Sequence, residues 1–268
     1  MKMKNIGSIT LVGAGPGDPD LITLKGVKAL NQAEVVLYDA LSNPELLNYA
    51  RDAEHIFVGK RPGVHRYKQE DINLLLVQKA LAGKNVVRLK GGDPFIFGRG
   101  HEEIEYAKCF NINTSIVPGI SSCISVPELQ EVPLTRRGVC ESFFVLTATT
   151  REAAFSKDIA VAATSTATVV ILMGMKKLPL IVEAFLKNDR DKTLVMIVQN
   201  GSLPNEKFVL GTIDTILEDV ENAGLSSPAI ITIGEVVRLH PELNLEYISA
   251  NSNYIDQIGQ EEINNDGR

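Results

Sequence analysis

Two glycine-rich segments contain the residue types best suited to holding a small molecule. The first reads ITLVGAGPGDPD over 9–20, and the second reads VVRLKGGDPFIFGRGHEE over 86–103. Each segment begins with an apolar run typical of a strand. Glycine tolerates positive φ and lets another molecule approach the backbone where a side chain would block it. Both segments therefore predict loops that could receive a ligand.

The first segment has the context of a dinucleotide-binding fingerprint but not its spacing. The position where G-x-G-x-x-G requires its third glycine is Asp18. Asp39, after the next apolar run, resembles the acid that binds a nucleotide ribose. However, Pro16 and Pro19 remove N–H donors from the loop that would hold a pyrophosphate. An NAD-dependent oxidoreductase is thus a weak alternative, and a tight strand-to-helix turn explains the glycines more simply.

The second segment places charged residues next to its loop. Asp93 and Pro94 predict a turn, and Arg99 lies between two glycines before a helix that opens with Glu102 and Glu103. Acidic residues in a first helical turn stabilise the helix through its dipole, so each glutamate taken alone has a structural explanation. Packing explains an arginine between two glycines less well. Arg99 is therefore the stronger candidate for binding.

The elements that must position these loops alternate between short apolar runs and helix-period segments, which predicts an α/β fold. The expected strands are 8–12, 34–38, 55–58, 85–89, 114–117, 142–146, 168–173, 193–198, 207–210 and 228–233. Further helices are expected at 178–187 and 212–222, and Leu24, Val27 and Leu30 fit one face of an earlier helix. Pro118-Gly119 is the best candidate hinge between two lobes.

The expected domains are an N-terminal α/β lobe over 1–117 that contains both glycine-rich loops, a C-terminal α/β lobe over 118–245 and a flexible polar tail over 246–268. The chain has 268 residues, 44% of them hydrophobic, which excludes a disordered protein. No apolar run approaches the roughly 20 residues that span a bilayer. The net charge of −6 gives no general attraction to nucleic acid or membranes. Three cysteines without a CxxC pair favour a reducing, cytoplasmic compartment, and four scattered histidines have no zinc-ligand spacing.

Ten strings in one order make the chain resemble the tetrapyrrole methylases over about residues 8–238. The strings are VGAGPGDPDLITLKG, LYDALS, VGKRPGVH, QEDINLLL, VVRLKGGDPFIFGRGHEE, VPGISS, VPLTRR, LMGMKKL, VQNGSLP and SPAIITIGEVV. The resemblance implies two α/β lobes with the active-site cleft between them, usually in a homodimer. It also implies S-adenosyl-L-methionine as co-substrate, S-adenosyl-L-homocysteine as product, and no metal.

The activity implied is C-methylation of uroporphyrinogen III at C2 and C7 to precorrin-2, which leads to siroheme or cobalamin. A later precorrin or cobalt-precorrin is the alternative substrate, and a tetrapyrrole carrier without catalysis is a third possibility. The resemblance assigns the cofactor to Pro16, Gly91, Gly92, Asp93, Ile96, Ser121, Ser122, Met173 and Gly201. It assigns acid–base or substrate-binding roles to Asp39, Lys60, Arg99, Glu102 and Arg137.

Chemistry separates these roles further. An arginine is a poor base because its pKa exceeds about 12, so Arg99 is expected to anchor substrate, and Asp39 or Glu102 is the better proton acceptor. Met173 would otherwise be interpreted as a core methionine after a buried strand. Four departures from the family pattern lie in the second half: Arg136-Arg137, Thr147-Ala148-Thr149, Leu172 and Asn200-Gly201-Ser202. These departures affect the expected cofactor contacts and the substrate specificity more than the class of reaction.

Overall fold

The computed structural model describes residues 6–59, 67–150 and 154–244, and it divides into two compact units. Unit 1 comprises residues 1–126, 198–207 and 227–230, and unit 2 comprises residues 127–197, 208–226 and 231–268. The units interleave along the chain. The division into lobes at 117/118, with a hinge at Pro118-Gly119, stays a prediction.

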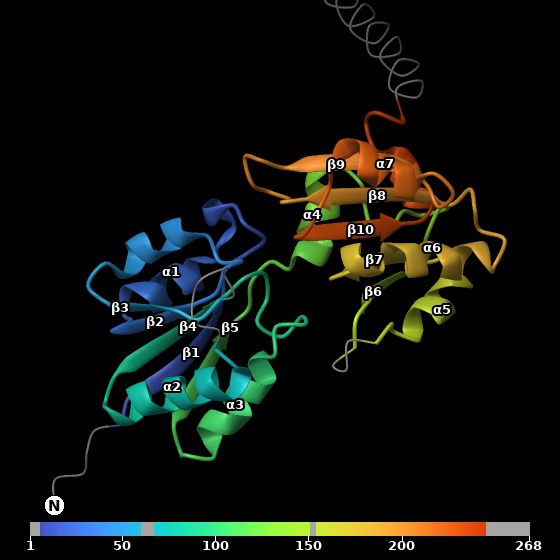
Figure 1. Ribbon diagram of the computed structural model, residues 1–268. Coiled ribbons are helices and arrows are strands. Elements are labelled where there is room, and N and C mark those ends of the chain that lie inside the picture. The colour runs from blue at the N-terminus through green and yellow to red at the C-terminus, as the bar shows by residue number, and fades with distance from the viewer. Residues whose placement is uncertain (1–5, 60–66, 151–153, 245–268) are drawn as a thin grey trace, which may run out of the picture. The chain divides into compact units, whose positions relative to one another are not determined.

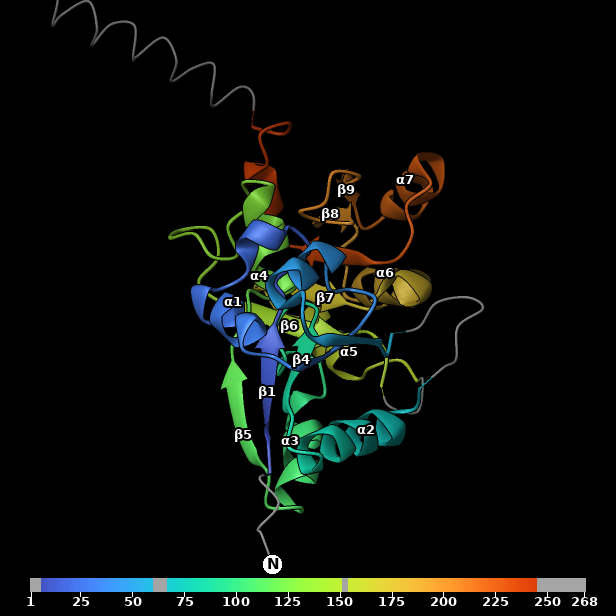
Figure 2. The same ribbon diagram turned by 90° about the vertical axis from the view of Figure 1, so that its left-hand side faces the viewer.

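Unit 1 is built on a parallel sheet with the strand order β3-β2-β4-β1-β5 (Figures 1 and 2). Its strands are β1 (Ser8–Gly13), β2 (Val35–Tyr38), β3 (Glu54–Phe57), β4 (Asn85–Lys90) and β5 (Asn113–Val117). This order differs from the 3-2-1-4-5 arrangement of a dinucleotide-binding Rossmann half, because β4 lies between β2 and β1. The weak nicotinamide alternative therefore lacks both the loop spacing and the strand order it requires.

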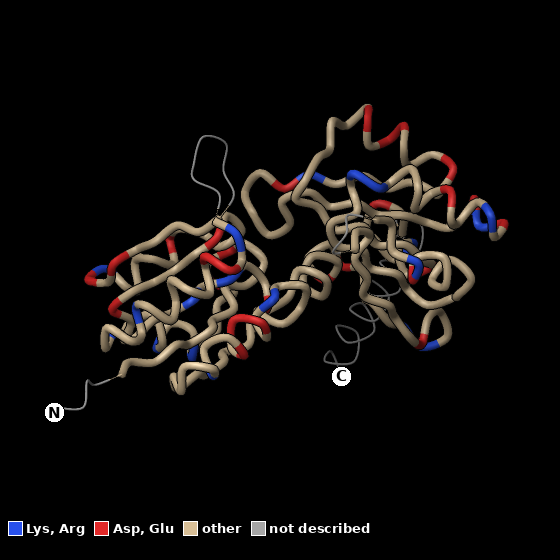
Figure 3. The backbone as a smooth tube through the Cα atoms, turned by 60° about the horizontal axis from the view of Figure 1, so that its bottom comes forward, with Lys and Arg blue, Asp and Glu red and all other residues tan. Residues whose placement is uncertain are grey.

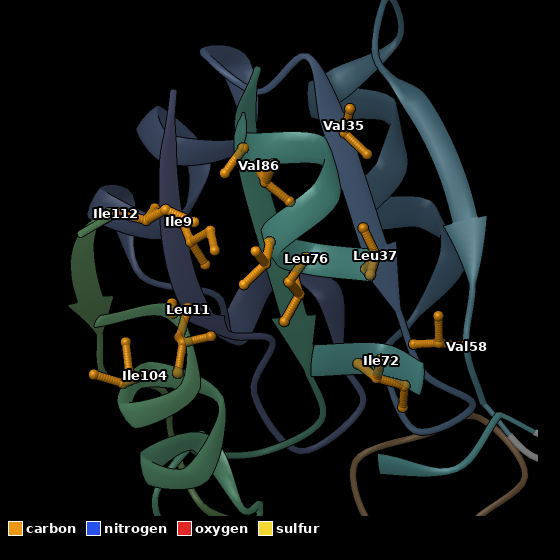
Figure 4. Packing of buried hydrophobic residues seen from close by; sticks show 13 residues of the cluster. Ile9, Leu11, Val35, Leu37, Val58, Ile72, Leu76, Val86, Ile104 and Ile112 are labelled. Carbon is orange, nitrogen blue, oxygen red and sulfur yellow. The ribbon is translucent and has the colours of Figure 1, made fainter. Parts of the chain in front are cut away.

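Alternation along the strands of unit 1 fills two cores, one on each face of the sheet. Ile9, Leu11 and Val86 pack on one face with Leu76 and Ile104 of the covering helices (Figure 4). The opposite face buries a separate set: Val12, Leu30, Val36, Leu46, Val87 and Leu89. A parallel sheet covered on both faces requires such nearly continuous apolar strands.

The helices of unit 1 lie on the two faces of this sheet (Figure 1). They are η1 (Pro19–Leu21), α1 (Leu24–Asn31), η2 (Pro44–Ala50), α2 (Gln69–Leu81) and α3 (Gly100–Lys108). The next helix, α4 (Ser122–Leu129), begins in unit 1 and ends in unit 2. The helix face expected from Leu24, Val27 and Leu30 is wrong at Leu24, which is 82% exposed. The buried residue in that turn is Gly26, where a Cβ would lie 3.2 Å from a side-chain carbon of Val12. The helix therefore approaches the sheet through a residue without a side chain.

Unit 2 contains a second sheet with the order β6-β7-β10-β8-β9, in which β6 and β7 are parallel. Its strands are β6 (Phe143–Thr147), β7 (Thr168–Leu172), β8 (Leu194–Gln199), β9 (Lys207–Thr212) and β10 (Ala229–Ile233). The helical segments are α5 (Asp158–Ala163), η3 (Met175–Lys177), α6 (Leu178–Leu186), α7 (Ile216–Ala223) and η4 (Glu235–Leu239). The central strands β7, β8 and β10 are almost entirely buried.

The expected fold class is confirmed, and all ten expected strands are present with ends within two residues of their predicted positions. The helix expected at 178–187 is also present. The helix expected at 212–222 begins only at Ile216, because β9 continues to Thr212 and a turn follows it. Within the described part of the chain, no helix is long and apolar enough to cross a membrane.

Candidate active site

The first glycine-rich loop, the second one and the Pro118–Ser122 segment all follow strands of the unit 1 sheet. They extend from the carboxyl ends of β1, β4 and β5 respectively. Because these strands are parallel, the three loops meet at one edge of the sheet. That edge is where open α/β sheets bind their ligands.

Glycines hold the three loops against one another. Gly15 and Gly92 exchange two backbone hydrogen bonds, with N···O distances of 3.3 and 2.7 Å. A Cβ on Gly13 would lie 2.4 Å from the Cα of Gly119, so neither residue could carry a side chain without moving a loop. Gly13, Gly15 and Gly119 are therefore explained by loop packing.

Gly91 and Gly92 differ in what surrounds them. A Cβ on Gly91 would lie 2.5 Å from Cβ of Leu41, which is again a packing constraint. Gly92 has φ of +65°, and a Cβ built there meets nothing closer than 3.9 Å, where the backbone of Ser121 and Ser122 lies. The open space beside Gly92 can thus accept a ligand against bare backbone, and it fits the close approach expected of a bound cofactor.

Asp93 joins two of the loops. Its Oδ1 accepts from the Phe95 N–H at 2.8 Å, and its Oδ2 accepts from the Gly119 N–H at 3.0 Å. A carboxylate has about four lone-pair positions, so both oxygens keep capacity for a further donor. The side chain can therefore stabilise the loops and still receive the hydroxyl or amino groups of a ligand.

The other cofactor candidates of unit 1 lie on the same loops or beside them. Ile96 is 43% exposed, Ser121 is buried, and Ser122 begins α4. Gly201 packs on Val126, where a Cβ would lie 2.6 Å from a valine methyl carbon.

The segment containing Gly201 also contacts the first glycine-rich loop. Ser202 Oγ accepts from the Asp18 N–H at 3.0 Å, and a Cβ on Gly17 would lie 2.9 Å from Leu203. Pro16 occupies the same loop. The structure thus gathers eight of the nine cofactor candidates in unit 1.

The ninth candidate, Met173, belongs to unit 2 and immediately follows β7. It is 55% exposed and has a left-handed backbone with φ of +55°. The interpretation as a buried core methionine is therefore wrong. An exposed methionine in a strained loop is better suited to contacting a ligand than to filling a core.

Asp39 follows the last residue of β2 at the same edge of the unit 1 sheet. Its Oδ1 accepts from the Leu41 N–H at 3.1 Å and from Ser42 Oγ at 3.3 Å. Its Oδ2 accepts from Arg88 Nη2 at 3.3 Å. The Asp39 side chain is 23% exposed, so its carboxylate is fixed by these hydrogen bonds and is still partly accessible to solvent.

Arg99 and Glu102 form a pair at the start of α3. Arg99 Nε and Nη2 donate to the two carboxylate oxygens of Glu102 at 2.8 and 2.6 Å. Both side chains are about half exposed, and Arg99 has φ of +59°. The guanidinium already presents its planar fork to one carboxylate, which is the geometry expected for a substrate carboxylate.

The remaining acid–base and binding candidates lie elsewhere. Lys60 is outside the described residues. Arg137 is exposed in unit 2, in a turn that the Arg136 and Cys140 backbones close with two 2.9 Å hydrogen bonds. Arg136, Arg137 and Arg238 line one depression on unit 2. A carboxylate-bearing ligand would meet three guanidinium groups there.

Glu103 differs from what its position in the first turn of α3 suggests. It is 1% exposed, and its Oε1 accepts from Arg88 Nε at 3.3 Å, Lys90 Nζ at 3.0 Å and Gln69 Nε2 at 3.0 Å. Burial lowers the pKa of the Lys90 ammonium, and the neighbouring Arg88 adds to this shift. Sequence reasoning missed this cluster, because a capping role explained Glu103 and nothing singled out Arg88 or Lys90.

The fold and the loops at the sheet edge define a ligand-binding α/β protein, and comparisons with known proteins identify its family. The family model described as Tetrapyrrole (Corrin/Porphyrin) Methylases matches residues 8–217. The chain therefore belongs to the tetrapyrrole methylase family. Among the described residues, no group of three or more histidine, cysteine, aspartate or glutamate side chains could hold a metal ion.

Three relatives show what the chain is similar to. It is 48% identical over 236 residues to a uroporphyrinogen-III C-methyltransferase of Methanocaldococcus jannaschii, covering 87% of this chain and 98% of that one. It is 42% identical over 239 residues to a siroheme synthase of Thiobacillus denitrificans; this match covers 88% of the chain but only 50% of the relative. The crystal structure of a uroporphyrin-III C-methyl transferase from Thermus thermophilus, in complex with S-adenosylhomocysteine, matches with a TM-score of 0.76 and 36% identity. That match covers 87% of this chain and all of the other.

Proposed function

We propose that this chain transfers the methyl group of S-adenosyl-L-methionine to C2 and C7 of uroporphyrinogen III, giving precorrin-2. The observation that carries this proposal is the 48% identity to a uroporphyrinogen-III C-methyltransferase across nearly the full length of that relative. The open space at Gly92 supports it, because a ligand can contact the loop backbone there.

The cofactor-binding residues act by position and by small polar groups. S-adenosyl-L-methionine supplies an electrophilic methyl group on a sulfonium sulfur. The Gly91–Asp93 loop and the Ser121-Ser122 backbone provide amide groups and a carboxylate for the polar parts of the molecule, while Pro16 and Ile96 offer apolar contact. Met173 of unit 2 is assigned to the cofactor by the family resemblance alone. Gly201 keeps its loop against Val126, beside the Asp18 contact. Holding the reacting atoms in line accounts for much of the expected rate.

The substrate has eight carboxylates, and an acidic protein must attract it locally. Seven of the 27 lysines and arginines lie in or next to the motifs and are the candidates for this attraction: Lys60, Arg61, Arg66, Lys68, Arg99, Arg136 and Arg137. Guanidinium groups bind carboxylates in a bidentate fashion, so the arginines suit this ligand. We assign Arg99 and Arg137 to substrate anchoring.

Loss of a proton from the macrocycle must follow attack by a ring carbon, and this step requires a base. Asp39 combines an accessible carboxylate with a fixed orientation, so we assign it as the proton acceptor. Glu102 is the other candidate for the base, but both of its carboxylate oxygens accept hydrogen bonds from Arg99. The resemblance implies an acid–base role for Lys60 as well. The proton that the base accepts leaves to solvent, so each methyl transfer releases one proton.

The test is to incubate the protein with S-adenosyl-L-methionine and anaerobically generated uroporphyrinogen III, and to follow product mass and absorbance. The proposal expects a product that has gained two methyl groups and lost two protons, a net addition of C2H4, with a monomethylated intermediate. The alternative, a later precorrin or cobalt-precorrin as substrate, expects no methylation here and turnover on those compounds. Binding of the tetrapyrrole without S-adenosylhomocysteine affinity would instead identify a carrier.

We further propose a homodimer in the cytoplasm that supplies precorrin-2 for siroheme or cobalamin. The family resemblance supports the dimer, and the absence of a CxxC pair among three cysteines supports a reducing compartment. Light scattering after size-exclusion chromatography tests the dimer, which requires a mass near twice 29.2 kDa. A monomer mass at working concentration would contradict it.

A further inference from the structure

The interior of unit 1 contains three charged side chains directly beneath the candidate site. Arg88 and Lys90 are two residues apart on β4, so their side chains point to the same face of the sheet, which α2 and α3 cover. Glu103 reaches them from α3. Each of these three side chains is at most 5% exposed. Charged residues are spread over both units (Figure 3), but this cluster lies inside.

The cluster is unbalanced by itself. Both cations reach the same oxygen of Glu103, while Glu103 Oε2 is buried and has no hydrogen-bond partner among the described residues. Two positive groups thus face one buried carboxylate. The second negative charge comes from Asp39, whose Oδ2 lies 3.3 Å from Arg88 Nη2. Arg88 is therefore shared between a buried glutamate and the candidate base.

Arg88 is held at every nitrogen. Its Nε donates to Glu103, its Nη1 donates to the Leu89 carbonyl at 2.7 Å and the Leu37 carbonyl at 3.4 Å, and its Nη2 donates to Asp39. The Leu41 N–H and Ser42 hydroxyl fix the other oxygen of Asp39. The plane of the Asp39 carboxylate is consequently determined by groups on both of its oxygens.

Stability alone does not account for this arrangement. Burying charges is costly, and apolar residues of similar size usually serve a core as well or better. Val86, on the same face of β4, is apolar and buried. A site that must hold a carboxylate in one orientation for proton transfer does account for it.

We propose that Arg88 is a positioning residue that orients the Asp39 carboxylate for proton transfer, and that Glu103 in turn holds Arg88. This inference rests on the proposed role of Asp39. Lys90 shares the glutamate, but among the described residues it makes no hydrogen bond or ion pair with Asp39 and acts on it only by a Coulomb attraction. It therefore provides the matched control for the direct contact. The two cations are equally buried, and removing either one deprives the same oxygen, Glu103 Oε1, of a partner.

The first experiment compares Arg88→Met with Lys90→Met in the full chain. We expect Arg88→Met to lower kcat by about 10- to 100-fold, as misplacement of a reacting group does, with the KM and the S-adenosylhomocysteine Kd changed by less than about threefold. Lys90→Met should keep kcat within about threefold, and its melting temperature measures how far losing a buried cation from this cluster destabilises the fold. Equal losses of kcat in the two variants would identify a merely structural cluster and overturn the proposal.

Arg88→Lys covers the case in which the methionine variant does not fold. It retains a cation beside Glu103, but one ammonium lacks the planar fork that spans Glu103 and Asp39. We expect kcat to fall by about 10-fold at unchanged S-adenosylhomocysteine affinity. Full activity in Arg88→Lys would overturn the bridging role.

The last experiment introduces Asp39→Asn. If Arg88 acts through Asp39, adding Arg88→Met or Arg88→Lys to Asp39→Asn should reduce kcat by less than about threefold more, because residues acting as a unit are not additive. Multiplicative losses would overturn the proposal while leaving Asp39 as the base. Unchanged kcat in Asp39→Asn alone would instead overturn the assigned base, and with it this inference.

Discussion

The two units bury polar groups of different kinds. Within the described residues, every buried lysine, arginine and glutamate belongs to unit 1: Arg88, Lys90 and Glu103. The buried polar residues of unit 2 are Ser156, Thr168, Thr193, Thr232 and His240. A hydroxyl can satisfy itself on a nearby carbonyl or thiol, as Thr168 does on Cys140 at 3.2 Å. The described core of unit 2 therefore contains no buried lysine, arginine or glutamate, whereas unit 1 buries three such residues near the carboxyl ends of its strands.

This difference shows where the protein departs from what stability favours. Ionised groups in an interior are costly even when paired, and they persist where a function requires a fixed charge. The unit 1 charges lie under the strand ends that bear Asp39 and the glycine loops. The unit 2 sheet has the composition expected of a scaffold. Substitutions of the polar groups that the two interiors hold should accordingly separate, with losses of turnover in unit 1 and losses of stability in unit 2.

The largest expected effect concerns Arg99. Replacing it with lysine removes the planar fork that a substrate carboxylate needs, so turnover should fall by about 100-fold or more. S-adenosylhomocysteine affinity should stay unchanged, because the proposed cofactor site lies at Gly92 and Asp93 and not at the guanidinium. Thermal stability should also stay unchanged, since the Arg99–Glu102 pair is half exposed and such pairs contribute about 0–1 kcal/mol. A solvated loop arginine would instead leave turnover within about 0.5 kcal/mol of the original.

Arg190→Lys is the matched substitution in unit 2. The Arg190 guanidinium donates to the Ser165 carbonyl and to Thr193 Oγ1, and it lies 5.5 Å from the centroid of the Phe185 ring. Losing these contacts should reduce the free energy of unfolding by about 1–2 kcal/mol. Turnover per folded molecule should be retained. Denaturant unfolding and initial rates should be measured on Arg99→Lys and Arg190→Lys. The comparison fails if Arg99→Lys loses stability and Arg190→Lys loses turnover.

A second, smaller effect separates two glycines with the same backbone conformation. Gly92 in unit 1 has φ of +65° and Gly224, which ends α7 in unit 2, has φ of +63°; an added Cβ would be unobstructed at both. Alanine at either position should cost about 1 kcal/mol of stability through its left-handed backbone. Only Gly92→Ala should also weaken S-adenosylhomocysteine binding, by about 10-fold or about 1.4 kcal/mol. Equal affinities in the two variants by calorimetry would place the cofactor elsewhere.

Sequence reasoning was most successful where one segment determines its own structure. Continuous apolar runs gave ten strands, because a strand buried on both faces has few polar residues. Leu24 was misplaced because α1 contacts the sheet through Gly26, and a glycine adds nothing to an apolar pattern. The position of the glycine loops followed from strand ends alone.

The buried charge cluster could not be predicted in the same way. Arg88 and Asp39 are far apart in the sequence, and they meet because the strand order places β4 beside β2. Glu103 has an adequate local explanation at a helix start, which hides its role inside the protein. The contacts of Arg88 with Asp39 and Glu103 depend on the tertiary arrangement, and the spacing of these three residues in the sequence does not predict them.

The smallest expected effect concerns His240, a buried imidazole of unit 2. Burial lowers the pKa of this imidazole from its ordinary 6.5, although Glu242 and Glu131 act in the opposite direction. Its Nδ1 accepts from the Glu242 N–H at 3.2 Å, and the ring packs 5.0 Å from Phe208, so the fold requires the neutral form. The unfolded chain then binds the extra proton first as the pH falls.

The stability that His240 contributes should consequently be complete above pH 6.5 and decline as the pH falls below 6.5 toward the lowered value in the fold. His240→Gln removes the titration, so the difference in unfolding free energy between the original protein and this variant should shrink on acidification. Carboxylates titrate in both proteins and cancel in that difference. Urea unfolding at pH 7.5, 6.5 and 5.5, each value about one unit apart around the ordinary histidine pKa, measures it. A constant difference would show that the pKa of His240 is the same in the folded and the unfolded chain, which would contradict the lowered pKa. A growing difference would mean that the fold raises this pKa and stabilises the charged imidazole.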